Sequence, residues 1–185
     1  MTRERARALA GQIERLGSCR TAFVPRRALV FSAEFRAICE TGTCGKYNRC
    51  YMCPPNIGSL ECLKQKIEEF NTVLVYQTVG CLEDSFDFEG MMRAKAIHSR
   101  LCRQVTHLVR ESGAAFFHLG PGGCLCDTCA KQSGEPCRFP NEALPSLEGC
   151  GISVSELASA AGLNYINGPN TVTYFSALLL NTEIF

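Results

Sequence analysis

The chain contains 185 residues, of which 46% are hydrophobic and 20% are charged, so it can bury a core and is not expected to be disordered. Nineteen basic residues against eighteen acidic ones leave a formal net charge of +1. That balance argues against a protein whose main role is to bind nucleic acid or an anionic membrane. Thirteen residues are cysteine, several times the ordinary usage, which predicts a protein whose cysteines bind metal or form disulfides.

Hydrophobic periodicity predicts helices and strands along most of the chain. Ala6, Leu9, Ile13 and Leu16 mark a one-faced helix at the start, and segment 28–31 has the pattern of a short strand. Further along we expect helices over 59–70, 89–112 and 155–161, and strands over 72–79, 114–119 and 171–180. In this interpretation His98 lies on the surface of the long helix, and His118 is a strand residue hydrogen-bonded to backbone.

The order of these elements predicts the fold class. A strand at 72–79, a long helix and a second strand at 114–119 form a βαβ unit, whose two strands run parallel. We therefore expect an α/β protein: one domain over residues 1–185, with a small mixed, mainly parallel sheet flanked by helices. Two long irregular segments, 36–58 and 120–150, carry most of the cysteines as cysteine-rich loops.

The cellular compartment decides whether the cysteines form disulfides or bind metal. The first seventeen residues lack the apolar stretch and cleavage site of a secretory signal, and no apolar run is long enough to span a membrane. We therefore expect a cytoplasmic protein, where structural disulfides are rare, and thirteen cysteines cannot all pair. A disulfide-linked secreted protein remains the less favoured alternative, so metal binding is the leading hypothesis.

Eight cysteines form two groups of four within the irregular segments. Their spacings are Cys39-x4-Cys44-x5-Cys50-x2-Cys53-Pro54-Pro55 and Gly122-Gly123-Cys124-x-Cys126-x2-Cys129-x7-Cys137. Four thiols are the number that closes a tetrahedral zinc site or ligates a [4Fe–4S] cluster. These eight cysteines are the predicted metal ligands.

The spacing favours iron–sulfur over zinc. Zinc sites usually show two short C-x2–4-C pairs separated by a longer stretch, which neither group matches. A cysteine group that ends in Cys53-Pro54 resembles the end of the bacterial ferredoxin motif, although the preceding intervals are longer. We expect one or two [4Fe–4S] clusters, with zinc as the alternative.

The positions of Cys81, Gly122 and Gly123 in the chain suggest that they too lie near the metal. Cys81 and Cys124 each follow a predicted strand, and ligands in open α/β sheets collect beyond the carboxyl ends of strands. Gly122 and Gly123 would let the backbone approach a cluster, and their amides would donate hydrogen bonds to its sulfurs, which makes them the predicted cofactor-binding residues.

Both groups belong to longer signatures. These are Cys44-x2-Tyr47-x5-Cys53-Pro54-Pro55 and Cys126-x2-Cys129-x7-Cys137-Arg138-x-Pro140, followed by Pro145-Ser146-x-Glu148-x2-Gly151-Ile152. They resemble the family of predicted metal-binding proteins known as domain of unknown function 2284. The resemblance implies cytoplasmic, oxygen-avoiding biology of anaerobes and cysteine-bound metal, with iron–sulfur favoured, but no settled reaction. The family pattern has two residues where only Leu125 separates Cys124 from Cys126, so Cys150 or Cys81 is an alternative ligand.

Three functions follow from this pattern. The first is a cytoplasmic iron–sulfur protein that transfers electrons to a redox protein partner or reductively activates it. For such an acidic partner, the docking site would be the basic residues of the long helix (Arg93, Lys95, Arg100, Arg103 and Arg110), which are otherwise a solvated face. The second is an enzyme whose cluster has three cysteine ligands and an open iron site for substrate. The third is a zinc-stabilised interaction module. No oligomeric state is predicted.

Overall fold

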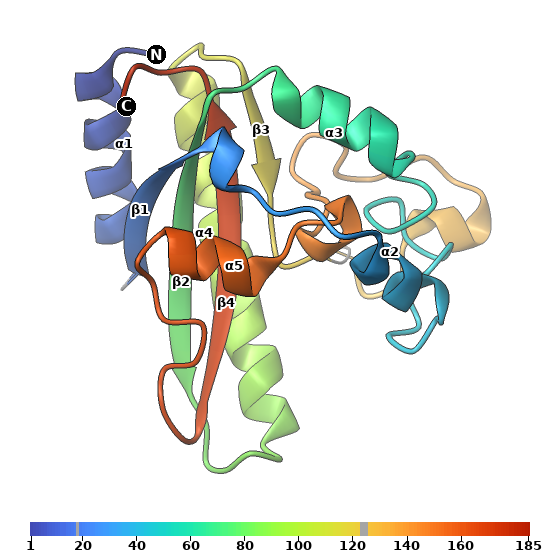
Figure 1. Ribbon diagram of the computed structural model, residues 1–185. Coiled ribbons are helices and arrows are strands. Elements are labelled where there is room, and N and C mark those ends of the chain that lie inside the picture. Colours follow the sequence, from blue (N-terminus) through green and yellow to red (C-terminus); the bar gives the residue numbers. More distant parts are fainter. Residues whose placement is uncertain (18, 123–125) are drawn as a thin grey trace.

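The computed structural model describes residues 1–17, 19–122 and 126–185. Within these residues, one sheet is covered by helices on both faces (Figure 1). Its strands are β1 (Cys19–Pro25), β2 (Thr72–Cys81), β3 (Phe116–Leu119) and β4 (Thr171–Leu180), in the order β1-β2-β4-β3. Every pair of neighbouring strands is antiparallel.

The prediction of a mainly parallel sheet is therefore wrong. β2 and β3 do run in the same direction, but β4 lies between them and is antiparallel to both. Leu178 of β4 pairs with Leu74 on one side and His118 on the other. The apolar run of β2 reflects a central strand covered on both faces, and this pattern carries no information about the direction of its neighbours.

Helices α1 (Arg3–Leu16) and α4 (Phe88–Glu111) cover one face of the sheet. Ile13 of α1 and Val105 of α4 are fully buried against Leu74 of β2, in a core that both helices share. Ile97 of α4 does not join this core and is 60% exposed. None of the helices in the described residues has the length and apolar character needed to cross a membrane.

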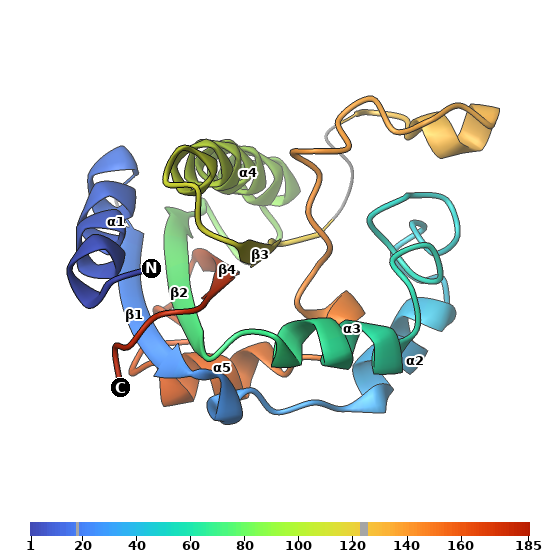
Figure 2. The same ribbon diagram turned by 90° about the horizontal axis from the view of Figure 1, so that it is seen from above.

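Helices α3 (Leu60–Glu68) and α5 (Val154–Ala160) cover the opposite face (Figure 2). Ile67 of α3 and Leu157 of α5 are fully buried in a second core with Val75 of β2. The predicted helices flanking the sheet are thus present, and the boundaries of α4, β2 and β4 lie within two residues of the expected ones.

The first third of the chain differs from the prediction. The expected strand at 28–31 does not form: Ala28 ends the 3-10 helix η1 (Arg26–Ala28), and within 28–31 only Phe31 makes an isolated bridge, to Ile152. The strand of this region, β1, lies earlier in the chain and was not expected. Helix α2 (Ala33–Glu40) begins after Ser32, whose hydroxyl accepts a hydrogen bond from the Glu34 N–H. It occupies the start of a segment that we expected to be irregular.

The two cysteine-rich segments lie together beyond the β3 edge of the sheet (Figures 1 and 2). The first runs from α2 to α3. The second runs from β3 to α5 and contains the short 3-10 helices η2 (Ala130–Ser133) and η3 (Glu148–Cys150). This edge therefore receives cysteines that are about eighty positions apart in the sequence.

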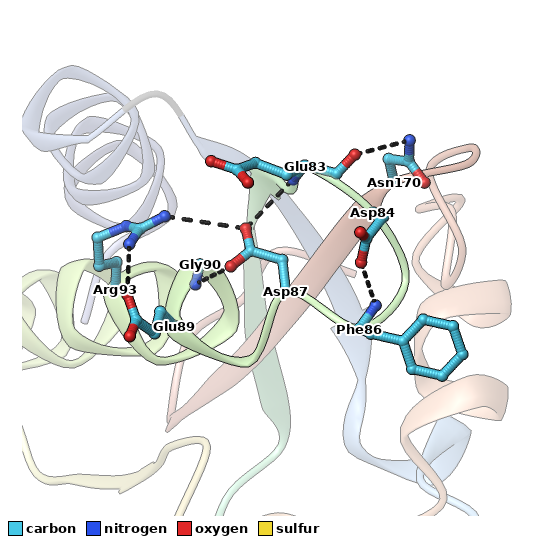
Figure 3. A network of polar contacts seen from close by, with 8 residues as sticks. All are labelled: Glu83, Asp84, Phe86, Asp87, Glu89, Gly90, Arg93 and Asn170. Atoms are coloured by element: carbon cyan, nitrogen blue, oxygen red, sulfur yellow. Dashed lines mark hydrogen bonds and ion pairs between the residues drawn. The ribbon is translucent and has the colours of Figure 1, made fainter.

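A polar network holds the loop between β2 and α4 at the far end of the sheet (Figure 3). Asp87 caps α4 by accepting from the Gly90 N–H at 2.7 Å, and it also accepts from the Glu83 N–H at 3.2 Å. These two donors, with Arg93 nearby, hold the pKa of Asp87 below its usual value. The network leaves Phe86 91% exposed, with its ring extending away from the polar groups.

Candidate metal centre

Arg36 ties the first cysteine segment to the second. This α2 side chain is 9% exposed, and its guanidinium donates to the Gly149 carbonyl at 2.8 Å and to the Gly58 carbonyl at 2.6 Å. Gly58 ends the first segment and Gly149 lies in η3. A charged donor that satisfies one buried and one half-buried carbonyl fixes both segment ends in one position. Sequence reasoning missed Arg36, because nothing in the sequence of this short helix marks its arginine as turned inward.

Local turns organise the cysteines of the first segment. The Cys53 N–H donates to the Cys50 carbonyl at 3.2 Å, and the Asn56 side-chain amide donates to that same carbonyl at 3.2 Å. The Met52 N–H lies 3.4 Å from Cys50 Sγ. Amide donors to cysteine sulfur stabilise the thiolate form that binds metal. Cys50 and Cys53 are therefore arranged around one turn.

Close packing explains one predicted glycine of the second segment. Gly120 forms a parallel bridge with Ser146, and its N–H donates to the Pro145 carbonyl at 2.9 Å. Gly122 has φ of +74°, and a Cβ at this position would lie 2.6 Å from the Ser146 Cβ. Gly122 is thus required by conformation and close approach. Gly123 and Cys124, the other predicted residues here, lie outside the described part of the chain.

The two segments meet at the thiols of Cys50, Cys53 and Cys129, which we call the cross-loop thiol cluster. The side chains of Cys53 and Cys129 are both close enough to Cys50 to change the pKa of its thiol. Contact with Cys53 and then burial raise the pKa of Cys50 strongly. Cys50 and Cys129 are 1% and 5% exposed. Nearby, the Tyr51 hydroxyl donates to the Glu135 carbonyl at 2.9 Å, so backbone and side chains join the segments at the same place.

The other predicted ligands lie around this cluster with less direct contact. Burial raises the pKa of Cys39, and the charge of Cys44 adds to that effect while Arg36 opposes it. Cys44 is exposed, whereas Cys126 and Cys137 are half-buried in the second segment. The structure brings Cys39 within electrostatic range of Cys44, and it brings Cys50 and Cys53 to Cys129.

Within the described residues, no three His, Cys, Asp or Glu side chains are arranged to hold a single metal ion. The cross-loop thiol cluster is nevertheless a set of soft donors suited to iron or zinc. Thiols that approach each other from two loops fit either a zinc ion or an iron–sulfur cluster by donor type.

The cysteines outside the two groups occupy other sites. β3 ends at Leu119, which pairs with Ala177 of β4, and Ala177 pairs in turn with Val75 of β2. Cys81 lies six residues beyond Val75 along β2, a distance of roughly 20 Å. β2 and β3 run in the same direction, and it is the greater length of β2 that carries Cys81 beyond the end of β3. Cys150 is fully buried in the core beneath α3 and α5, and burial raises its pKa to about 12.

A buried polar network crosses the sheet beneath α4. At one end, His98 contacts Thr78 Oγ1 through Nδ1 (2.8 Å) and Ser176 Oγ through Nε2 (2.8 Å). In the middle, Cys102 Sγ contacts Ser176 Oγ (3.1 Å) and the Tyr76 hydroxyl (3.2 Å). At the other end, His118 contacts the Tyr76 hydroxyl through Nε2 (2.8 Å) and Thr106 Oγ1 through Nδ1 (2.9 Å). His98 is fully buried, so its predicted surface position is wrong, and His118 bonds to side chains rather than to backbone.

The protonation of this network follows from its donors. The Thr106 hydroxyl donates its only hydrogen to the Cys102 carbonyl at 2.9 Å, so it accepts from His118 Nδ1–H. His118 Nε2 is then free to accept from Tyr76. Burial lowers the pKa of His98 to about 4 and that of His118 to about 3. Both imidazoles are neutral hydrogen-bonding groups of the core.

The chain belongs to the family described as "Predicted metal-binding protein (DUF2284)", whose model matches residues 22–180. This match confirms the family resemblance of the two cysteine signatures and supports a metal-binding role. No curated protein and no solved structure matches the chain.

Proposed function

We propose that this chain is a cytoplasmic iron–sulfur protein that carries up to two [4Fe–4S] clusters and transfers electrons to a redox protein partner. The observation that carries the proposal is the cross-loop thiol cluster, in which Cys50 contacts Cys53 from its own segment and Cys129 from the other. We infer that these three cysteines ligate one cluster together. Ligands drawn from two sequence groups are also found in two-cluster ferredoxins.

The surroundings of the cluster suit this role. A bound [4Fe–4S] cluster would supply a one-electron carrier whose potential depends on burial and on hydrogen bonds to sulfur. Cys50 and Cys129 are buried and the Met52 N–H points at Cys50 Sγ, so solvent is excluded from these thiols while backbone dipoles stabilise negative charge. Arg36 holds the two segments in register and adds a fixed positive charge near Cys39.

The test is the metal content and spectrum of protein purified without oxygen from cells supplied with iron and sulfide. We expect a broad absorption near about 400 nm that bleaches with dithionite, and about four or eight irons per chain for one or two clusters. A colourless protein with one or two zinc ions and no sulfide would contradict the proposal and leave a zinc-stabilised module.

The proposed partner is an acidic redox protein that docks on α4. Arg93 pairs with Asp87 and Glu89, and the Arg110 guanidinium donates to the Asn141 carbonyl, so both are engaged within the chain. Of the other three, Arg100 is exposed, and Lys95 and Arg103 are half-buried. If they steer a partner, electron transfer to acidic acceptors should slow severalfold between about 0.05 and 0.5 M salt. A rate that is independent of salt would contradict this docking site.

A further inference from the structure

An open cleft of about 340 Å³ lies beside the cysteine segment, between α3 and β3. Its walls come from the first cysteine segment, from α3, from β3 and from residues 143–145. This volume is at the lower end of the range for small-molecule sites, which is about 300–1,000 Å³. Met52 is the nearest link to the metal centre, because it stands between Cys50 and Cys53.

The interior of the cleft is mainly apolar. Met52, Ile57, Leu63, Phe117 and Pro145 contribute hydrocarbon, sulfur or ring surface to its walls. Leu63 and Phe117 are 5% and 9% exposed, so these walls are backed by the packed core. Such a surface favours the apolar body of a small organic molecule over a hydrated inorganic ion.

One cation stands at the cleft. The Lys66 ammonium lies 4.2 Å from the centroid of the Phe117 ring, which holds it over the wall. In the described residues the ion pairs are those of Arg93 with Asp87 and Glu89, and no carboxylate neutralises Lys66. The amide of Asn56 and the hydroxyl of Tyr51 already donate to backbone carbonyls. Lys66 is therefore the charge left to select a ligand.

We propose that this cleft binds a small organic carboxylate, with its apolar body between Phe117 and Met52 and its carboxylate at the Lys66 ammonium. An apolar cleft with one uncompensated cation is complementary to a molecule with one negative end and one hydrocarbon end. The inference rests on the geometry of the cleft and holds for either metal. Bound ligand would lie against the turn that carries Cys50 and Cys53.

The test is calorimetric titration of the metal-loaded protein with 3-phenylpropionate and with its uncharged amide, 3-phenylpropanamide. We expect the carboxylate to bind at least about tenfold more tightly than the amide, because only the carboxylate pairs with Lys66. Equal affinities, or no binding of either compound at about 10 mM, would overturn the proposal.

Three variants locate the binding site. Lys66→Gln should weaken carboxylate binding about tenfold and leave amide binding unchanged. The matched control is Lys64→Gln, because Lys64 is on the same helix and also lies over a ring, that of Phe31 at 5.4 Å, but does not line the cleft. Ala143→Leu, which fills the cleft without changing charge, should reduce binding of both compounds. Equal losses in the two lysine variants would place the ligand elsewhere. Metal is counted in every variant, so a failed iron–sulfur proposal is recognised separately.

Discussion

Cys50→Ser and Cys129→Ser are expected to remove the same metal centre, although the two residues are 79 positions apart in the sequence. Each should lower iron, sulfide and visible absorption by the same fraction, because the thiols of both belong to the cross-loop thiol cluster. The double variant should lose no more than either single variant, since a centre can be lost only once.

The alternative arrangement gives a different result. If each group of four cysteines held its own centre, the two single variants would remove different halves of the iron, and the double variant would remove both. Cys81→Ser is the matched control: Cys81 is an exposed cysteine at the end of β2, distant from the cysteine segments, and its replacement should leave the iron content unchanged.

Acidification is expected to destabilise the fold between about pH 6.5 and pH 4 through His98 and His118. Both imidazoles are buried and neutral, with the pKa lowered to about 4 and about 3, against about 6.5 in an unfolded chain. In this window the unfolded state binds more protons than the folded state, so stability falls as the pH falls. At pH 5 each histidine should reduce the free energy of unfolding by about 2 kcal/mol relative to pH 7.5.

This pH dependence is measured by urea unfolding at pH 7.5 and pH 5. His118→Gln should be less stable than the unaltered chain at pH 7.5, because it breaks the bonds to Tyr76 and Thr106, but its loss between the two pH values should be about 2 kcal/mol smaller. His107→Gln is the control, since His107 is an exposed histidine of α4 outside the buried polar network. An unchanged slope in His118→Gln would show that the pKa of His118 is the same in the folded and unfolded states, which contradicts its burial as a neutral group.

The long elements could be predicted from sequence because their patterns are strong. α4 and β4 bury regular stripes of side chains, and such periodicity depends only on which residues face the core. β1 and α2 were missed because each is short and only partly buried, so turn residues and tertiary contacts decide their conformation. His98 was misassigned because it is a polar residue on the buried stripe of α4, where Thr78 and Ser176 hydrogen-bond to its ring.

The candidate site was predicted in part. Thiol number and spacing indicated two cysteine-rich segments and metal binding, and the family match supports that conclusion. The contact between Cys50 and Cys129 could not be predicted, because spacing within one segment says nothing about its distance from another. The roles of Arg36 and Lys66 were equally hidden, since each depends on carbonyls or rings supplied by distant residues.

By itself, the sequence determined the family, the two groups of cysteines and the positions of the main helices and strands, because these follow from local composition and periodicity. Only the tertiary structure decided that β4 lies between β2 and β3, which makes the sheet antiparallel. It also decided that β2 extends past the end of β3, which separates Cys81 from the cysteine segments. Strand pairing and loop contacts join residues far apart in the chain. Their free energies depend on the packing of the whole molecule, which no local pattern records.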